Sequence, residues 1–200
     1  METRNTLASI RILRERLLPA ERSEELVDAV EGHLPDARKA AVLVPLFEQD
    51  GEIYIVFIRR ASTLRSHSGE IAFPGGSVDV TDASPVMTAL REAQEEIGLD
   101  PSNVEVLGVL APVFTVVSNF LITPVVAFLP QGLGELHLQT SEVKELILVP
   151  LRGVADPAIL HTEQWTRGNM ARIVHFYDYG PYRIWGATGR MLNAFLETLK

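Results

Sequence analysis

Three glutamates crowd into the segment ALREAQEEIG, at positions 92, 95 and 96. Positions i, i+3 and i+4 of an α-helix share one face, so Glu92, Glu95 and Glu96 would bring three carboxylates within reach of a common centre. Such carboxylates repel one another, and a hard divalent cation that prefers oxygen ligands, with Mg²⁺ as the first candidate, would relieve the repulsion. The pattern therefore favours metal-dependent hydrolysis of a phosphoanhydride, with a solvated helix face as the structural alternative.

A glycine turn precedes these glutamates. The run Phe73-Pro74-Gly75-Gly76 continues neither a strand nor a helix, and its paired glycines let the backbone approach a ligand or a metal closely. Asp79 and Asp82 follow in an acidic loop.

Arginines supply the positive charge nearest to that loop. Arg59, Arg60 and Arg65 lie just upstream of the turn, with His67 close behind. The planar fork of arginine suits phosphate oxygens, so we expect these side chains to contact the phosphates of a substrate, a solvated loop being the alternative.

The carboxylates need a helix with defined ends, and the sequence predicts both. Ser84 followed by Pro85 is typical of a side-chain N-cap with proline at the first helical position, and Gly98 favours a left-handed C-cap. Within the helix, Arg91 lies four residues before Glu95, so it can pair with that carboxylate and fix its rotamer.

Hydrophobic patterns predict the remaining elements. Amphipathic helices are expected over residues 6–18, 21–33 and 187–199. Strands are expected over 40–47 and 52–58, joined as a hairpin, and over 104–113, 121–129, 172–177 and 182–185, with a short apolar run at 146–151. Residues 114–120 are expected to form a loop near the substrate, and 153–169 mainly loop with a short helix. The pattern indicates a mixed sheet with helices, of α+β or α/β class.

Composition narrows the class of protein. The net charge of −8 disfavours non-specific binding to nucleic acid, and the absence of cysteine excludes disulfides, thiolate catalysis and cysteine-ligated zinc. No apolar run approaches the roughly 18 residues of a membrane span, and the N-terminus lacks the apolar region of a signal peptide. We expect a soluble, cytoplasmic protein that has a small-molecule substrate and neither a nucleic-acid nor a membrane partner.

Gly76 and the run from Arg91 to Leu99, REAQEEIGL, resemble the signature box of the Nudix hydrolases, a glycine followed by REUxEExGU. The first half of the box departs from the family pattern. Asp82 stands where the family has a glutamate, and the gap from there to the arginine is one residue longer.

The segment upstream narrows the resemblance to one branch of the family. Arg60, Arg65, Gly69 and the Phe-Pro-Gly-Gly turn follow the spacing R-x4-R-x3-G-x3-FPGG, which is similar to the coenzyme A diphosphatases. Arg59 lies outside that motif. The resemblance implies an α/β/α sandwich, a mixed sheet flanked by helices, over residues 36–200. Residues 1–35 would form a helical extension that packs on the domain, binds a partner or contributes to a homodimer.

The resemblance also implies roles for individual residues. Glu92 and Glu96 would bind the metal, Glu95 would be a further ligand or orient water, and the backbone carbonyl of Gly75 would complete the inner shell. Arg91 would hold the helix carboxylates in place. The metal would be Mg²⁺ or Mn²⁺.

A glutamate from a late loop serves as base or extra ligand in many Nudix enzymes. Glu142 stands at the matching place, with Glu145 as the rival.

The implied reaction is attack of water on the diphosphate of coenzyme A or its derivatives, which gives 3′,5′-ADP and 4′-phosphopantetheine. Arg59, Arg60 and Arg65 offer a physical reason for a preference for the extra 3′-phosphate of coenzyme A. Two alternatives stay open at this point. One is a Nudix diphosphatase acting on another nucleoside diphosphate derivative such as ADP-ribose or NADH, and the other is a non-catalytic ligand-sensing module.

Overall fold

A computed structural model describes residues 3–200, apart from 32–33, 35, 63–68 and 168–169. The helices are α1 (Thr3–Arg16), α2 (Ser23–Glu31), α3 (Pro85–Ile97), α4 (Leu151–Val154) and α5 (Gly186–Thr198), with 3-10 turns at Ala20–Arg22, Pro101–Asn103 and Pro157–Ile159. The strands are β1 (Arg38–Gln49), β2 (Glu52–Arg60), β3 (Ile71–Ala72), β4 (Gly75–Ser77), β5 (Glu105–Val109), β6 (Val113–Thr115), β7 (Phe120–Leu129), β8 (Val143–Pro150), β9 (Leu160–Arg167), β10 (Met170–Tyr179) and β11 (Tyr182–Ile184).

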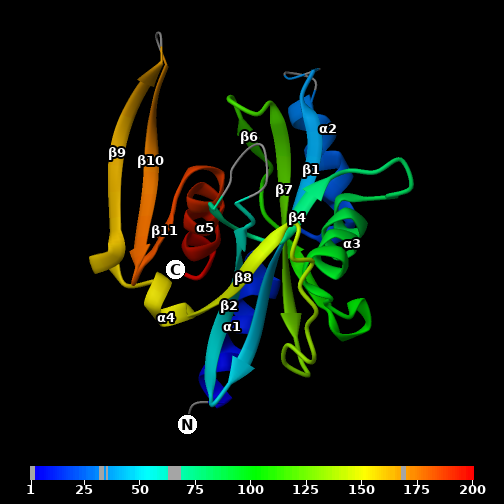
Figure 1. Ribbon diagram of the computed structural model, residues 1–200, viewed down its shortest axis with the longest axis vertical. Helices are drawn as coiled ribbons and strands as arrows, with labels where there is room; N and C mark the ends of the chain where they lie inside the picture. Colours follow the sequence, from blue (N-terminus) through cyan, green and yellow to red (C-terminus); the bar gives the residue numbers. More distant parts are fainter. Residues whose placement is uncertain (1–2, 32–33, 35, 63–68, 168–169) are drawn as a thin grey trace.

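A mixed sheet runs through the centre of the molecule (Figure 1). Its main path has the order β3-β2-β1-β7-β5, and β4, β6 and β8 pair with β1, β7 and β2. β1 is antiparallel to β2 and parallel to β7. The expected hairpin between β1 and β2 is confirmed, and its two turn residues, Asp50 and Gly51, have φ of 53° and 79°. Positive φ at both positions is the geometry of a tight two-residue hairpin turn.

The sheet has an apolar cluster on each face, because successive side chains of a strand point to opposite sides. In β2, Ile55 and Phe57 belong to the cluster under α1 and α5, while Val56 and Ile58 belong to the cluster under α3. Figure 1 shows these helices on opposite sides of the sheet. The expected α+β fold, a sheet between two helical layers, is confirmed.

A second, three-stranded sheet adds to the layer that contains α5. It has the order β11-β10-β9 and antiparallel pairing throughout. The expected pairing of residues 172–177 with 182–185 is confirmed, but the expectation of mainly loop over 153–169 was wrong. Residues 160–166 pair in register with β10, although most of them are exposed. Because these residues are mostly polar, they show no alternation of apolar and polar side chains that would predict a strand. Their strand structure comes from backbone pairing with β10.

Two further expectations are corrected. The single strand expected over 104–113 is divided into β5 and β6, with Leu110, Ala111 and Pro112 between them. The segment 114–120, expected to be a loop, is a short hairpin in which Thr115 pairs with Phe120. Backbone pairing of both β5 and β6 with β7 explains the difference, because one long strand accepts two short partners along one edge.

The N-terminal helices pack on the domain. Ile10, Leu13 and Leu17 are buried in the same cluster as β2 and α5, and Leu26 of α2 packs against the cluster under α3. The boundary at residue 35 stays a prediction. None of the described helices is long and apolar enough to cross a membrane.

If α1 is an integral part of the core, Leu13→Ala should lower the free energy of unfolding by about 2–5 kcal/mol, because Leu13 is fully buried. Urea unfolding measures the change. Arg11→Ala, on the exposed face of the same helix, is the matched control and should cost less than about 0.5 kcal/mol. Equal effects of the two substitutions would show that α1 only rests on the surface.

Candidate active site

The helix that carries the glutamates has the ends expected from its sequence. The Ser84 hydroxyl accepts a hydrogen bond from the Met87 backbone N–H at 3.3 Å, and Pro85 takes the first helical position. Gly98 ends the helix at φ 71° and donates its N–H to the Gln94 carbonyl at 2.9 Å. Ala89, Ala93 and Ile97 of α3 are fully buried, in the cluster that α3 shares with the sheet. The adjoining face of α3, which carries the carboxylates, is therefore fixed in direction.

Glu96 is the deepest of the three glutamates. Its side chain is 3% exposed, and one of its carboxylate oxygens accepts the Gly75 backbone N–H at 2.9 Å. The guanidinium of Arg60 lies 3.7 Å from the other oxygen. Burial raises the pKa of Glu96 to about 7, and the Gly75 N–H and the Arg60 charge only partly oppose that rise.

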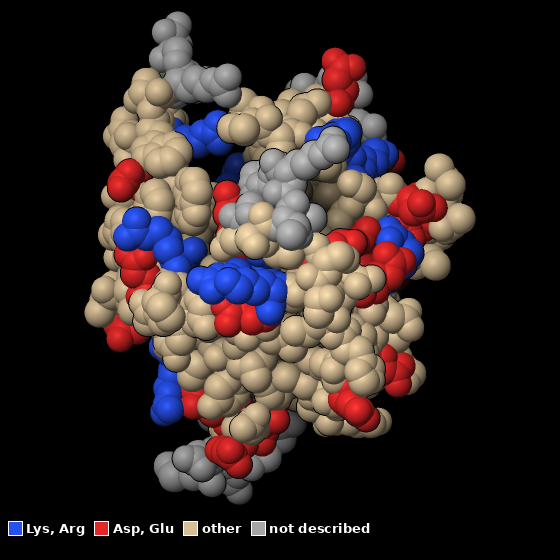
Figure 2. All heavy atoms as spheres, in the orientation of Figure 1, with Lys and Arg blue, Asp and Glu red and all other residues tan. Residues whose placement is uncertain are grey.

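Arg91 connects the acidic loop to the helix. Its guanidinium donates to both carboxylate oxygens of Asp82, at 2.9 to 3.3 Å, and to the Ser77 carbonyl at 3.0 Å. It also donates to Glu92 at 3.0 Å and to Glu95 at 3.3 Å, which confirms the expected pairing at i, i+4. The hydrogen bonds from Arg91 lower the pKa of the Asp82 carboxyl to about 2. Figure 2 shows acidic and basic side chains side by side over α3 and the loop before it.

Two adjacent glycines allow the turn to meet the helix. A Cβ at Gly76 would lie 2.5 Å from the Glu92 carboxylate carbon, and one at Gly75 would lie 2.4 Å from the Ala41 carbonyl oxygen. Gly75 also has a φ of 154°, which side chains rarely permit. A larger residue at position 75 would meet the β1 backbone and displace the turn, whereas one at position 76 would displace the Glu92 carboxylate.

The strand alternation separates the two neighbouring arginines. Arg60 has the parity of Val56 and Ile58 and points to the α3 side, toward Glu96. Arg59 has the opposite parity and forms an ion pair with Glu145 at 2.7 Å, with its guanidinium 5.6 Å from the Tyr182 ring centre. The structure thus brings Arg60 to the carboxylates and leaves Arg59 on the other face. Arg65 and His67 lie outside the described residues.

Their neighbours distinguish the two late glutamates, of which Glu145 lies in β8 and Glu142 in the turn before it. Glu145 is held by Arg59 on the far face. Glu142 lies on the carboxylate side, and its negative charge contributes to the raised pKa of both Glu92 and Glu96. Its backbone carbonyl accepts the Ala61 N–H, which fixes the start of β8 beside the end of β2. Sequence spacing alone left these two residues as rivals.

Sequence reasoning missed two contacts that order the site. One is the double hydrogen bond between Asp82 and Arg91, and the other is the approach of Arg60 to Glu96. The nine-residue separation of Asp82 and Arg91 corresponds to no helical spacing, so only the folded loop reveals the first contact. The expected substrate loop at 114–120 is instead the β6–β7 hairpin.

The residues fit a divalent cation in their chemistry. Burial raises the pKa of Glu92 and Glu96, and the neighbouring charge of Glu142 raises both further, which is the electrostatic situation that a bound cation relieves. Among the described residues, however, no three acidic or histidine side chains are arranged to hold a metal ion as they stand. Glu92 and Glu95 each accept a hydrogen bond from Arg91 with one carboxylate oxygen.

Residues 37–168 match the family model described as the NUDIX domain. The chain is 38% identical over 163 residues to the uncharacterized Nudix hydrolase NudL of Photorhabdus laumondii subsp. laumondii, a match that covers 82% of this chain and 86% of the relative. It is 39% identical over 143 residues to the peroxisomal coenzyme A diphosphatase NUDT7 of Mus musculus, covering 72% of this chain and 60% of the mouse protein. A crystal structure of a C. elegans Ap4A hydrolase binary complex has a TM-score of 0.48 at 19% identity, covering 58% of this chain and 82% of that one.

The pKa of Glu96 predicts how its substitution changes stability. A carboxyl whose pKa is about 7 when folded, above the ordinary value of 4.5, makes the protein less stable as pH rises between these values. Glu96→Gln should therefore raise the free energy of unfolding of the metal-free protein at pH 8 by roughly 2 to 4 kcal/mol, and by little at pH 4. Urea unfolding at both pH values measures this difference.

Glu95→Gln provides the matched control, because the Glu95 side chain is 60% exposed. It should bring no comparable gain at pH 8. A Glu96→Gln protein that is less stable than the wild type at pH 8 would contradict the assignment of a costly buried charge.

Proposed function

This chain belongs to the NUDIX domain family of hydrolases, which act on diphosphate bonds, and we propose that its substrate is coenzyme A or a coenzyme A derivative. Hydrolysis of the central diphosphate would give 3′,5′-ADP and 4′-phosphopantetheine. The observation that carries the proposal is the position of Arg60, which follows the upstream arginine motif and lies 3.7 Å from Glu96. The name of the mouse relative, a coenzyme A diphosphatase, supports the same substrate class.

The metal site proposed here consists of Glu92, Glu96 and the Gly75 carbonyl, with Glu95 as a further ligand or a group that orients water. A bound Mg²⁺ or Mn²⁺ would neutralise charge on the phosphate oxygens and lower the pKa of a water molecule. The Gly75 N–H holds the Glu96 side chain at a fixed depth, so that this carboxylate is positioned before a ligand arrives. Arg91 donates hydrogen bonds to Glu92 and Glu95, which orients both carboxylates on the same helix.

In the proposed reaction, the oxygen of a water molecule forms a bond to one phosphorus while the bond from that phosphorus to the bridging oxygen breaks. Glu142 is the proposed base that removes the proton from the water, because its charge acts on Glu92 and Glu96. Arg60 and Arg65 are the proposed contacts to substrate phosphate, of which the 3′-phosphate of coenzyme A is the distinguishing one. Arg59, held by Glu145, is left out of this set.

A substrate panel tests the proposal. Purified protein is incubated with coenzyme A, ADP-ribose and NADH, each with and without Mg²⁺ or Mn²⁺. We expect turnover only with metal, and the highest kcat/KM on coenzyme A. Glu96→Gln should reduce kcat on the order of 100-fold. A higher kcat/KM on ADP-ribose or NADH than on coenzyme A would show that coenzyme A is not the preferred substrate. Absence of metal-dependent turnover on all three compounds would refute the proposal.

The identity of the base can be tested by a matched pair of variants. Glu142→Gln should reduce kcat by about 100-fold or more, since general base catalysis contributes at least that much. Glu145→Gln should leave kcat within about twofold, because Glu145 pairs with Arg59 on the opposite face of the sheet. A large loss of kcat in Glu145→Gln with little loss in Glu142→Gln would assign the role of base to Glu145.

Contact with the 3′-phosphate can be tested by removing that phosphate from the substrate. Arg60→Ala should raise the KM for coenzyme A by about tenfold, the usual effect of losing a charge-assisted hydrogen bond. It should change the KM for 3′-dephospho-coenzyme A much less. Arg59→Ala is the control, with little effect on either KM. An equal loss on both substrates would show that Arg60 acts on the carboxylates rather than on the 3′-phosphate.

A further inference from the structure

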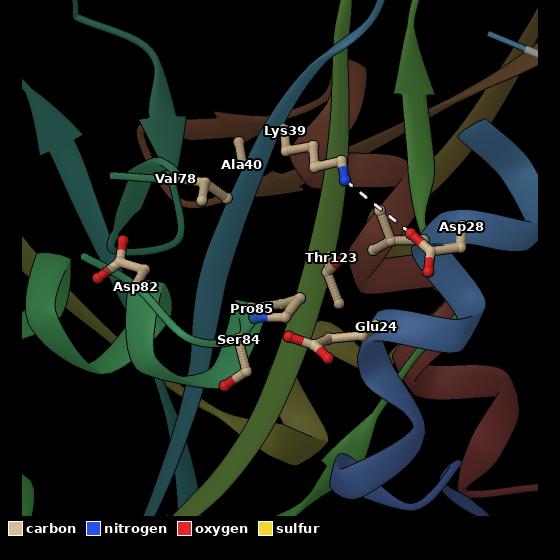
Figure 3. A pocket seen from close by; sticks show the side chains of 10 residues that line it. Glu24, Asp28, Lys39, Ala40, Val78, Asp82, Ser84, Pro85 and Thr123 are labelled. Carbon is tan, nitrogen blue, oxygen red and sulfur yellow. Dashed lines mark ion pairs between the residues drawn. The ribbon is translucent and has the colours of Figure 1, made fainter. Parts of the chain in front are cut away.

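A cavity of about 330 Å³ lies between α2 and the central sheet (Figure 3). α2 provides one wall, and the rest comes from β1, β7 and the segment that leads into α3. Lys39 also lines the cavity, and its ammonium lies 4.0 Å from an Asp28 carboxylate oxygen, so opposite charges already meet there. The cavity is the boundary between the N-terminal extension and the family domain, which begins at residue 37 in the family match.

The edge of the second sheet is a feature of a different kind. β9 pairs with β10 on one side, and in the part of the chain that the structure describes no strand pairs with its other side. Figure 1 shows β9 at the outer margin of the molecule, beyond β10. Residues 161–166 are all exposed, so the rest of the chain leaves both faces of this segment open to solvent.

β9 lacks the features that usually keep an edge strand from pairing with another strand. Such edges are commonly short, interrupted by proline or distorted by a bulge. β9 has eight residues and no proline, and its register with β10 runs from Leu160 to Arg167 without a shift. Its free backbone N–H and C=O groups therefore have the regular spacing that a further strand requires.

The order of residue types along β9 is complementary to itself. Positions 163, 165 and 167 share one face of the strand, because alternate residues do, and they are glutamate, tryptophan and arginine. Two antiparallel copies related by a two-fold axis at Trp165 place position 163 of each chain opposite position 167 of the other. Opposite charges are then cross-strand neighbours on both sides of a central pair of tryptophans, which stabilises the pairing.

The charges also select this register over the neighbouring one. A two-fold axis at Gln164 would place Glu163 opposite Trp165, and His161 opposite Arg167. That arrangement leaves each glutamate without a cationic neighbour and brings two basic residues together.

Trp165 is held in position for such a contact. Its indole N–H donates to the Glu163 carboxylate at 2.7 Å, and its ring centre lies 6.1 Å from the ring centres of both Phe176 and Trp185. The residue is nevertheless 45% exposed. An ordered tryptophan with much of its surface in solvent is typical of the centre of a protein interface, because it buries a large apolar area at a small cost in side-chain entropy.

We propose that two copies of this chain associate through antiparallel pairing of their β9 strands, centred on Trp165. The two three-stranded sheets then join into one continuous sheet. The carboxylates of α3 take no part in this interface, so the proposal does not depend on which diphosphate the enzyme cleaves.

Sedimentation velocity of the full-length protein over a wide range of concentration tests the proposal. We expect a reversible monomer–dimer equilibrium. Glu163→Arg and Arg167→Glu each place like charges opposite one another twice in the dimer, and each should raise the dissociation constant by at least about tenfold. Glu135→Arg is the matched control, because it reverses an exposed charge in the loop before β8, and it should leave the dissociation constant unchanged.

Mixing the two charge-reversed variants tests the register itself. In a mixed dimer, arginine at position 163 of one chain lies opposite glutamate at position 167 of the other, and the native pair is kept on the other side of the axis. The equimolar mixture should therefore dimerise about as tightly as the wild type, although each variant alone does not. A wild-type protein that stays monomeric, variants that dimerise as the wild type does, or a mixture that fails to recover dimerisation would each overturn the proposal.

Discussion

The hydrogen bond from the Gly75 N–H to the buried Glu96 carboxylate joins the two parts from which the candidate site is made. It ties a turn that pairs with β1 to a buried carboxylate at the edge of the packed face of α3. The bond requires glycine at the turn, because a side chain at Gly75 would meet the β1 backbone. It also requires that a carboxylate be buried, which is unfavourable for its charged form. The site therefore holds a charge that a cation would stabilise.

Arg91 supplies the positive charge that compensates the neighbouring carboxylates. It collects Asp82, Glu92 and Glu95 around one guanidinium and bonds the Ser77 carbonyl, so the acidic loop closes on the helix. The loop is one residue longer than the family pattern and has an aspartate where the family has a glutamate. Asp82 still reaches Arg91 with both oxygens, and so the departure in sequence is accommodated in the fold.

The two faces of the central sheet have different roles, one carrying the candidate site and the other packing against helices and the second sheet. The face under α3 carries Arg60, the glutamates and the start of β8, while the other face packs α1, α5 and the second sheet. α1 and α2 cover opposite faces, so the N-terminal extension is joined to both layers. α2 closes one side of a cavity whose remaining wall comes from the family domain.

Local patterns in the sequence determined α3, because its caps at Ser84 and Gly98 and its i, i+3, i+4 glutamates depend only on neighbouring residues. The β1–β2 hairpin was determined in the same way, by apolar runs on either side of a turn. The strand β9 was not, since its residues are mostly exposed and its order comes from pairing with β10.

Tertiary structure alone decided which of Arg59 and Arg60 meets Glu96, and that Glu145 is paired with Arg59 while the charge of Glu142 acts on Glu96. The sequence shows that neighbours in a strand point to opposite faces, but it does not say which face carries the site. It also could not give the burial that raises the pKa of Glu96 to about 7, because burial depends on chain segments that are distant in sequence and adjacent only when folded.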